Sequence, residues 1–135
     1  MKILNEKESF FQQSVDLFDI VLNGTKIDFD NEQDKQVLGA YLFGILNGLG
    51  REKNISPTDI QATMIQILSK KLNYTLESAV QFSQYLINST DKSFHPTIFA
   101  IIHRGLKGYY LFKDQNIKSL LEDFESILKT IKSEG

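Results

Sequence analysis

The sequence predicts an all-α protein, a single domain built as a bundle of about six helices. Apolar residues recur at three- and four-residue steps along most of the chain. Capping residues and helix breakers separate these stretches, and no segment alternates with the two-residue period of a strand. A chain of 135 residues can bury a core without metals or disulfides. We therefore assign residues 1–135 to one domain and expect 1–6 and 132–135 to fray.

The first expected helix covers residues 7–22 and places its apolar residues on one face: Phe10, Phe11, Val15, Leu17, Phe18, Val21 and Leu22. Gly24 is expected to end this helix, because glycine readily adopts the left-handed conformation of a helix C-terminus. Residues 26–30 are expected to form a loop. Asp30 or Asn31 then caps the next helix by accepting from its free N–H groups.

The second expected helix, residues 31–49, is apolar on nearly every side in its later turns, which predicts a central position in the bundle. Ala40, Gly44 and Gly48 lie four residues apart and form a smooth strip. Each glycine inside a helix costs about 1 kcal/mol relative to alanine. We expect close packing of another helix to offset that cost. Residues 50–54 are expected to be a polar connection.

The third expected helix begins with Ser56 as N-cap and Pro57 at the first helical position. Its buried stripe is expected to contain Ile60, Met64, Ile67, Leu68 and Leu72. Thr75 caps the fourth helix, which runs to about Asn88. The residues expected to be buried on that helix are Leu76, Ala79, Val80, Phe82, Leu86 and Ile87.

The fifth expected helix begins at Pro96, and its apolar positions are Ile98, Ile101, Ile102, Leu106, Tyr109 and Phe112. Residues 114–116 break the pattern, and Asn116 caps the last helix. The expected apolar stripe of that helix is Ile117, Leu120, Leu121, Phe124, Ile127, Leu128 and Ile131.

The net charge of −2 is unevenly distributed along the chain. Residues 1–34 contain eight acids and three lysines, a net charge of −5, whereas residues 35–75 have a net charge of +3. A nucleic-acid partner is not expected, because the sequence lacks a dense basic stripe with interleaved aromatic residues. The acids Asp28, Asp30, Glu32 and Asp34 could attract a basic protein partner. The alternative is a solvated charged loop.

The composition argues against most catalytic and membrane classes. The chain has no cysteine, no run of about 18 apolar residues, and no signal-peptide core in its first residues, so we expect a cytoplasmic protein without a membrane partner. His95 and His103 are eight residues apart, about 12 Å along a helix, which is too far for one metal ion. A serine nucleophile motif and a phosphate-binding glycine loop are also missing. We expect no metal, no cofactor and no catalytic residue.

One alternative keeps a ligand-binding or enzymatic role open. Asp91 with His95 or His103 could form an acid–base pair, and Arg104 could complete a small pocket. The structural interpretation is that His95 begins the fifth helix while Asp91 braces the preceding loop. Convergence of these side chains on one cavity would favour the enzymatic alternative.

The segment around His103 contains the best remaining functional candidates. Arg104 has a planar fork suited to carboxylates, either elsewhere in the fold or in a partner. Gly105 and Gly108 permit another backbone to approach, for example the strip on the second helix. Tyr109 and Tyr110 are typical of interfaces and equally of core boundaries. An interface role and a structural role both stay open, and so does a homodimer formed through this helix.

Several motifs in this region resemble the signature of the immunity protein 48 family of bacterial polymorphic toxin systems. They are Asp91-Lys92, His95-Pro96-Thr97, Ile101-Ile102-His103-Arg104-Gly105 and Gly108-Tyr109-Tyr110, with Phe43-Gly44, Asn47-Gly48 and Ser56-Pro57 upstream. The resemblance covers residues 37–110. It implies a small, helical, non-enzymatic cytoplasmic protein that binds a cognate toxin and protects its maker. The candidate partner-binding residues are Asp28, Asp30, Glu32, Asp34, His103, Arg104, Tyr109 and Tyr110.

Overall fold

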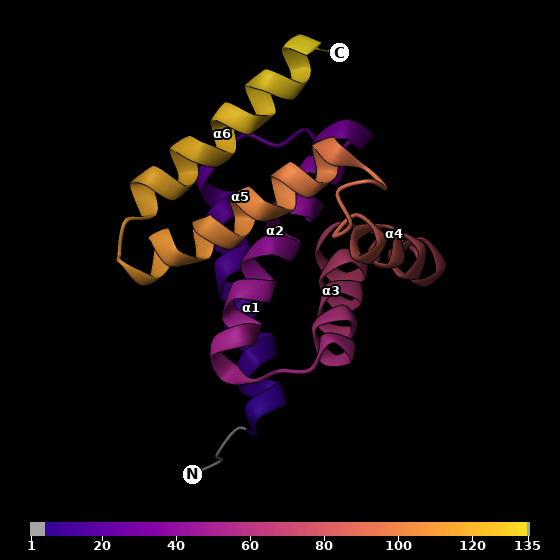
Figure 1. Cartoon of the computed structure of the whole chain (residues 1–135), viewed down its shortest axis with the longest axis vertical. Helices are drawn as coiled ribbons and strands as arrows, with labels where there is room; N and C mark the ends of the chain where they lie inside the picture. Colours follow the sequence, from indigo (N-terminus) through magenta and orange to yellow (C-terminus); the bar gives the residue numbers. More distant parts are fainter. Residues whose placement is uncertain (1–4, 135) are drawn as a thin grey trace.

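The computed structural model describes residues 5–134, which fold into six helices and contain no strand (Figure 1). The helices are α1 (Glu6–Gly24), α2 (Glu32–Lys53), α3 (Pro57–Lys71), α4 (Leu76–Asn88), α5 (Pro96–Lys113) and α6 (Ile117–Glu134). This confirms the all-α, single-domain prediction. Of the ends expected to fray, Glu6 and residues 132–134 are helical, whereas residues 1–4 and Gly135 lie outside the described residues.

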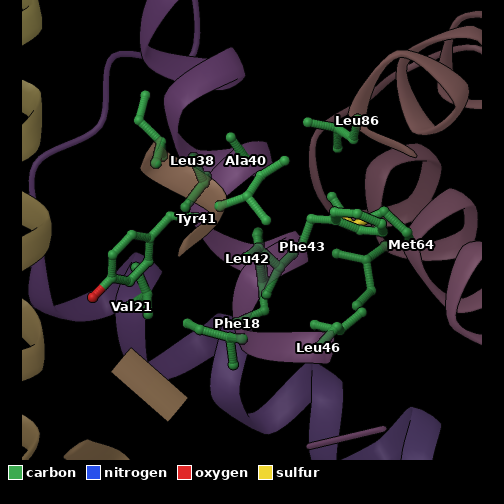
Figure 2. Close-up of a cluster of buried hydrophobic side chains, with 14 of the residues drawn as sticks. Phe18, Val21, Leu38, Ala40, Tyr41, Leu42, Phe43, Leu46, Met64 and Leu86 are labelled. Atoms are coloured by element: carbon green, nitrogen blue, oxygen red, sulfur yellow. The ribbon is translucent and has the colours of Figure 1, made fainter. Parts of the chain in front are cut away.

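Helix α2 is the centre of the bundle, as its composition predicts. It contacts α1, α3, α5 and α6, and Gly39 lies against the ring of Phe82 on α4. Figure 2 shows side chains leaving α2 on opposite sides, with Phe43 directed toward Met64 of α3 and Tyr41 directed away from it. A helix surrounded in this way needs apolar residues on all sides, which explains its sequence.

The other helices each contribute one apolar stripe to the core. Fully buried side chains include Phe10 and Phe18 of α1, Met64 and Leu68 of α3, and Leu86 of α4. Helices α5 and α6 bury Ile98, Ile101, Ile102, Tyr109, Leu120, Phe124, Ile127 and Leu128. The predicted periodic faces of α1, α3, α5 and α6 are therefore largely confirmed.

The closest helix contact is the crossing of α2 and α5, visible in Figure 1 where α5 lies across α2. A Cβ atom on Gly44 would lie 2.0 Å from the carbonyl oxygen of Ile102, and a Cβ on Gly105 would lie 2.0 Å from that of Tyr41. The two backbones touch, which only glycine permits. The predicted packing of Gly105 against the glycine strip of α2 is confirmed.

Two helix ends differ from the sequence prediction. Gly24 is the last residue of α1 and is not left-handed. The helix ends at Thr25, which is extended and donates its hydroxyl to the Val21 carbonyl. Instead, Gly24 makes room for α6, since a Cβ there would lie 2.5 Å from Leu121 Cδ1. Helix α2 does not stop at Leu49 but continues to Lys53.

The longer α2 has a clear physical cause. Its end is set by Asn54, which is left-handed with φ of 55°. Gly50, predicted as part of a polar connection, is buried, and a Cβ there would lie 2.6 Å from Ile60 Cδ1. The last turn also contains Glu52, whose carboxylate accepts hydrogen bonds from two residues of α5, Tyr109 and Lys113. Contacts with distant residues therefore stabilise a turn whose local sequence resembles a loop.

Three predicted core residues are exposed. On α4, Leu76 is 67% exposed and Val80 is 43% exposed, and on α6 Ile117 is 38% exposed. Helix α4 lies at the edge of the bundle, mainly against α3, so it buries only one side. Ile117 is the first residue of its helix and projects beyond the core.

The helix starts agree well with the predicted caps. Of the two candidates before α2, Asn31 is the cap and accepts from the Asp34 N–H. Ser56 and Thr75 cap α3 and α4 in the same way, and Asn116 Oδ1 accepts from the Ser119 N–H at the start of α6. None of the helices within residues 5–134 has an apolar stretch of the length that crossing a membrane requires.

Candidate functional site

Three consecutive residues of α5 point to three different surroundings. Gly105 lies against the backbone of α2, and Arg104 is bound to Asp123 of α6. His103 is exposed and contacts Phe99, one turn earlier, with ring centroids 4.6 Å apart. The motif His103-Arg104-Gly105 therefore combines two residues that build the fold with one that faces solvent.

Arg104 and Tyr41 share one carboxylate, that of Asp123. The Arg104 Nε lies 3.1 Å from Asp123 Oδ1, and its Nη2 donates to the same oxygen. The hydroxyl of Tyr41, a residue with no exposed surface, donates to Asp123 Oδ2 at 3.1 Å. Burial, followed by the charge of Asp123, raises the pKa of Tyr41 well above its usual range. The carboxylate predicted for Arg104 thus lies within the fold.

Tyr109 and Tyr110 have different environments. Tyr109 is 4% exposed, and burial and its hydrogen bond to Glu52 raise the pKa of its hydroxyl. Hydrogen bonds from Lys113 and then Tyr109 lower the pKa of Glu52. Tyr110 is 44% exposed and packs edge-on against Tyr109. Only Tyr110 offers its ring to a partner.

The acids at and just before the start of α2 differ in their exposure. Asp28, Asp30 and Glu32 are exposed, and Phe29 between the first two is exposed as well. Asp34, in contrast, is 1% exposed: it accepts from the Asp28 N–H at 3.1 Å and lies 3.4 Å from Lys132 Nζ. Asp34 holds the segment in place and is not accessible in the folded protein.

Asp91 and His95 stabilise local backbone. Asp91 accepts from both the N–H and the hydroxyl of Ser93, and these bonds lower the pKa of Asp91. His95 is the N-cap of α5, and its Nδ1 accepts from the Ile98 N–H at 3.1 Å. These are the structural roles that the sequence suggested as the alternative to catalysis.

His95 and His103 line separate hollows. His95 borders one of about 300 Å³ between α2, α4, α5 and α6, together with Gln33, Gln36, Tyr85 and Thr97. His103 borders a smaller one of about 160 Å³ between α2 and α5. Arg104 borders neither hollow, since it is turned to α6. In the part of the chain that the structure describes, no group of three or more acidic or histidine side chains is placed to hold a metal ion.

The hollow beside His103 includes residues, Arg51 and Thr90 among them, that the sequence did not indicate as functional candidates. It is lined by Gly44, Asn47, Arg51, Thr90, Phe99, Ile102, His103 and Leu106. Gly44, Asn47 and Arg51 are spaced i, i+3 and i+7, so they share one face of α2. That spacing could have identified this face of the helix from the sequence. Arg51 was missed because the helix was expected to end at Leu49.

The chain was compared with known proteins. The model of one protein family, described as immunity protein 48, matches residues 10–132. The comparisons with curated proteins and with solved structures found no match. The family match extends well beyond the motif region of 37–110 and includes all of the residues that form the α2–α5 crossing. The chain therefore belongs to the immunity protein 48 family.

Proposed function

We propose that this protein binds a cognate bacterial toxin in the cytoplasm of the cell that makes it and neutralises that toxin. The observation that carries the proposal is the family match over residues 10–132. The fold supports this proposal, because a bundle with a densely packed centre offers a partner a rigid surface. Little conformational entropy is then lost when the partner binds. Neutralisation would follow from tight occlusion of the toxin rather than from chemistry.

The enzymatic alternative receives less support from the side-chain contacts. Asp91 is engaged with Ser93, His95 with the start of α5, and Arg104 with Asp123. His103 is directed to a different hollow from His95. A reaction centre would require these groups to converge on one position, whereas Asp91, His95 and Arg104 are each engaged in a separate contact.

Co-expression with the toxin tests the proposal. A toxin gene from the neighbourhood of the gene for this protein would be expressed in a sensitive bacterium, once alone and once together with this protein. Among cells that express the active toxin, we expect growth only of those that also express this protein, and recovery of the two proteins as one complex. A catalytically inactive toxin serves as the control for expression burden. Continued killing, with no complex recovered for any neighbouring toxin, would exclude this function.

We also propose that the exposed acids Asp28, Asp30 and Glu32 accelerate association with a basic toxin surface. The triple variant D28N/D30N/E32Q is expected to lower the association rate about tenfold at low salt and to reduce its salt dependence. The matched control, E77Q/D114N/E122Q, removes the same charge from exposed positions elsewhere. Equal association rates for the two triple variants, measured by stopped-flow fluorescence, would argue against steering by this segment.

A homodimer is a second proposal for how the exposed face of α5 is used. Tyr110 of α5 and Ile117 of α6, at 44% and 38% exposure, lie on either side of the turn between these helices and would form the contact. Small-angle scattering at increasing concentration measures the mass directly. A monomer at the highest concentration removes the homodimer from consideration and leaves toxin binding unaffected.

A further inference from the structure

Helix α5 is basic and has no acidic residue, although the whole chain is slightly acidic. Of its four basic or histidine side chains, Arg104 is paired with Asp123 and Lys113 with Glu52. His103 and Lys107 have no ion pair among the residues that the structure describes, and the same holds for Arg51 on the adjacent turn of α2. The crossing of the two helices therefore presents an arginine, a lysine and a histidine that form no ion pair within the described part of the fold.

The hollow at this crossing brings Arg51 and His103 together. They come from different helices and both line the hollow, whose floor includes Gly44, where the two backbones meet. Its apolar wall consists of Phe99, Ile102 and Leu106, and Thr90 from the connection between α4 and α5 closes one side. A guanidinium and an imidazole beside apolar side chains suit a short aliphatic side chain that ends in a carboxylate.

The acids nearest to the hollow in sequence are already engaged. Glu52, next to Arg51, accepts from Tyr109 and Lys113, and Asp91, next to Thr90, accepts from Ser93. Asn47 and Thr90 donate to the backbone carbonyls of Phe43 and Ile87. Among the described residues, the Arg51 guanidinium and the His103 imidazole make no side-chain hydrogen bond, so both can bind an incoming oxygen, and Asn47 keeps one further N–H.

The size of the hollow favours a single side chain over a free ligand. Its volume is about 160 Å³, whereas pockets for drug-sized ligands measure about 300–1,000 Å³. A carboxylate delivered by a protein surface needs only a recess of this size. It would be held by the charge-assisted bonds that are among the strongest in protein interfaces.

We propose that this hollow receives one aspartate or glutamate side chain of the toxin, with Arg51 and His103 as the residues that bind its carboxylate. This inference rests on the proposed function and specifies a contact within it. It also assigns Arg51, which no motif had identified, to the toxin-binding surface.

The test compares toxin binding by the wild-type protein and by the variant R51Q/H103Q. Both side chains are exposed, so the variant is expected to keep the wild-type circular dichroism spectrum and melting temperature. Its Kd for the toxin is expected to rise about 100-fold, mostly through faster dissociation. R51K keeps the charge but loses the planar fork, and a rise of about tenfold is expected. The control K129Q removes a charge from an exposed position on α6 and should leave Kd unchanged.

A scan of the toxin's own acids completes the experiment. Substituting each surface aspartate by asparagine and each glutamate by glutamine should reveal one position whose effect largely disappears in the R51Q/H103Q background. If the double variant binds within about threefold of wild type, or no toxin acid couples to it, the inference is wrong while the proposed function stands. If the wild-type protein binds no toxin, both are wrong.

Discussion

Replacing Gly44 with alanine is expected to lower the free energy of unfolding by roughly 3 kcal/mol, a large part of the stability of a domain this size. The new Cβ would lie 2.0 Å from the Ile102 carbonyl oxygen and 2.7 Å from the Leu106 nitrogen, both of them backbone atoms. Neither can rotate away, so α2 and α5 must separate and loosen the centre of the core. The better helix propensity of alanine, about 1 kcal/mol, offsets only part of this loss.

Urea unfolding followed by circular dichroism measures the effect, and G24A is the matched control. Gly24 is also helical, but its Cβ would meet the tip of the flexible Leu121 side chain, which can move. We expect a change of less than about 1 kcal/mol for G24A and a loss similar to that of G44A for G105A, which faces the Tyr41 carbonyl oxygen. Equal stabilities of G44A and G24A would show that the two helices are not in backbone contact.

Replacing Asp123 with alanine is expected to destabilise the protein by about 2 kcal/mol, because it leaves the buried Tyr41 hydroxyl without an acceptor. The ion pair with Arg104 adds little, since the Arg104 side chain is 46% exposed. The loss therefore arises in the core rather than at the surface.

A double-mutant cycle separates these contributions. Y41F removes the hydroxyl and is expected to cost about 1 kcal/mol. In the Y41F background, D123A should cost much less than in wild type, since no buried donor is then left unpaired. Urea unfolding of the wild type, D123A, Y41F and the double variant gives the four free energies of unfolding that the cycle compares. Independent, additive effects of D123A and Y41F would mean that their hydrogen bond contributes nothing to stability.

Helix starts and the identity of the central helix could be predicted because they depend on neighbouring residues. Ser56 reaches an N–H only three residues away, and its preference for the N-cap position does not require the rest of the fold. The close approach at Gly44 and Gly105 was also predictable, since interior glycines need a compensating contact. The exposure of Leu76 was not, because periodicity marks a helix face without showing whether another helix covers it.

The candidate site also combines features that depend on neighbouring residues with features that depend on helix packing. The sequence alone determined an all-α chain, the starts of the five helices after the first, and the segment around His103 as the one with unusual chemistry. The tertiary structure decided which of its side chains are available. Arg104 and Tyr109 bind carboxylates that lie 19 and 57 residues away, so the fold engages them. Arg51 joins His103 only because α2 extends past Leu49 and crosses α5. Contacts between distant residues depend on how helices pack, and helical periodicity carries no information about that packing.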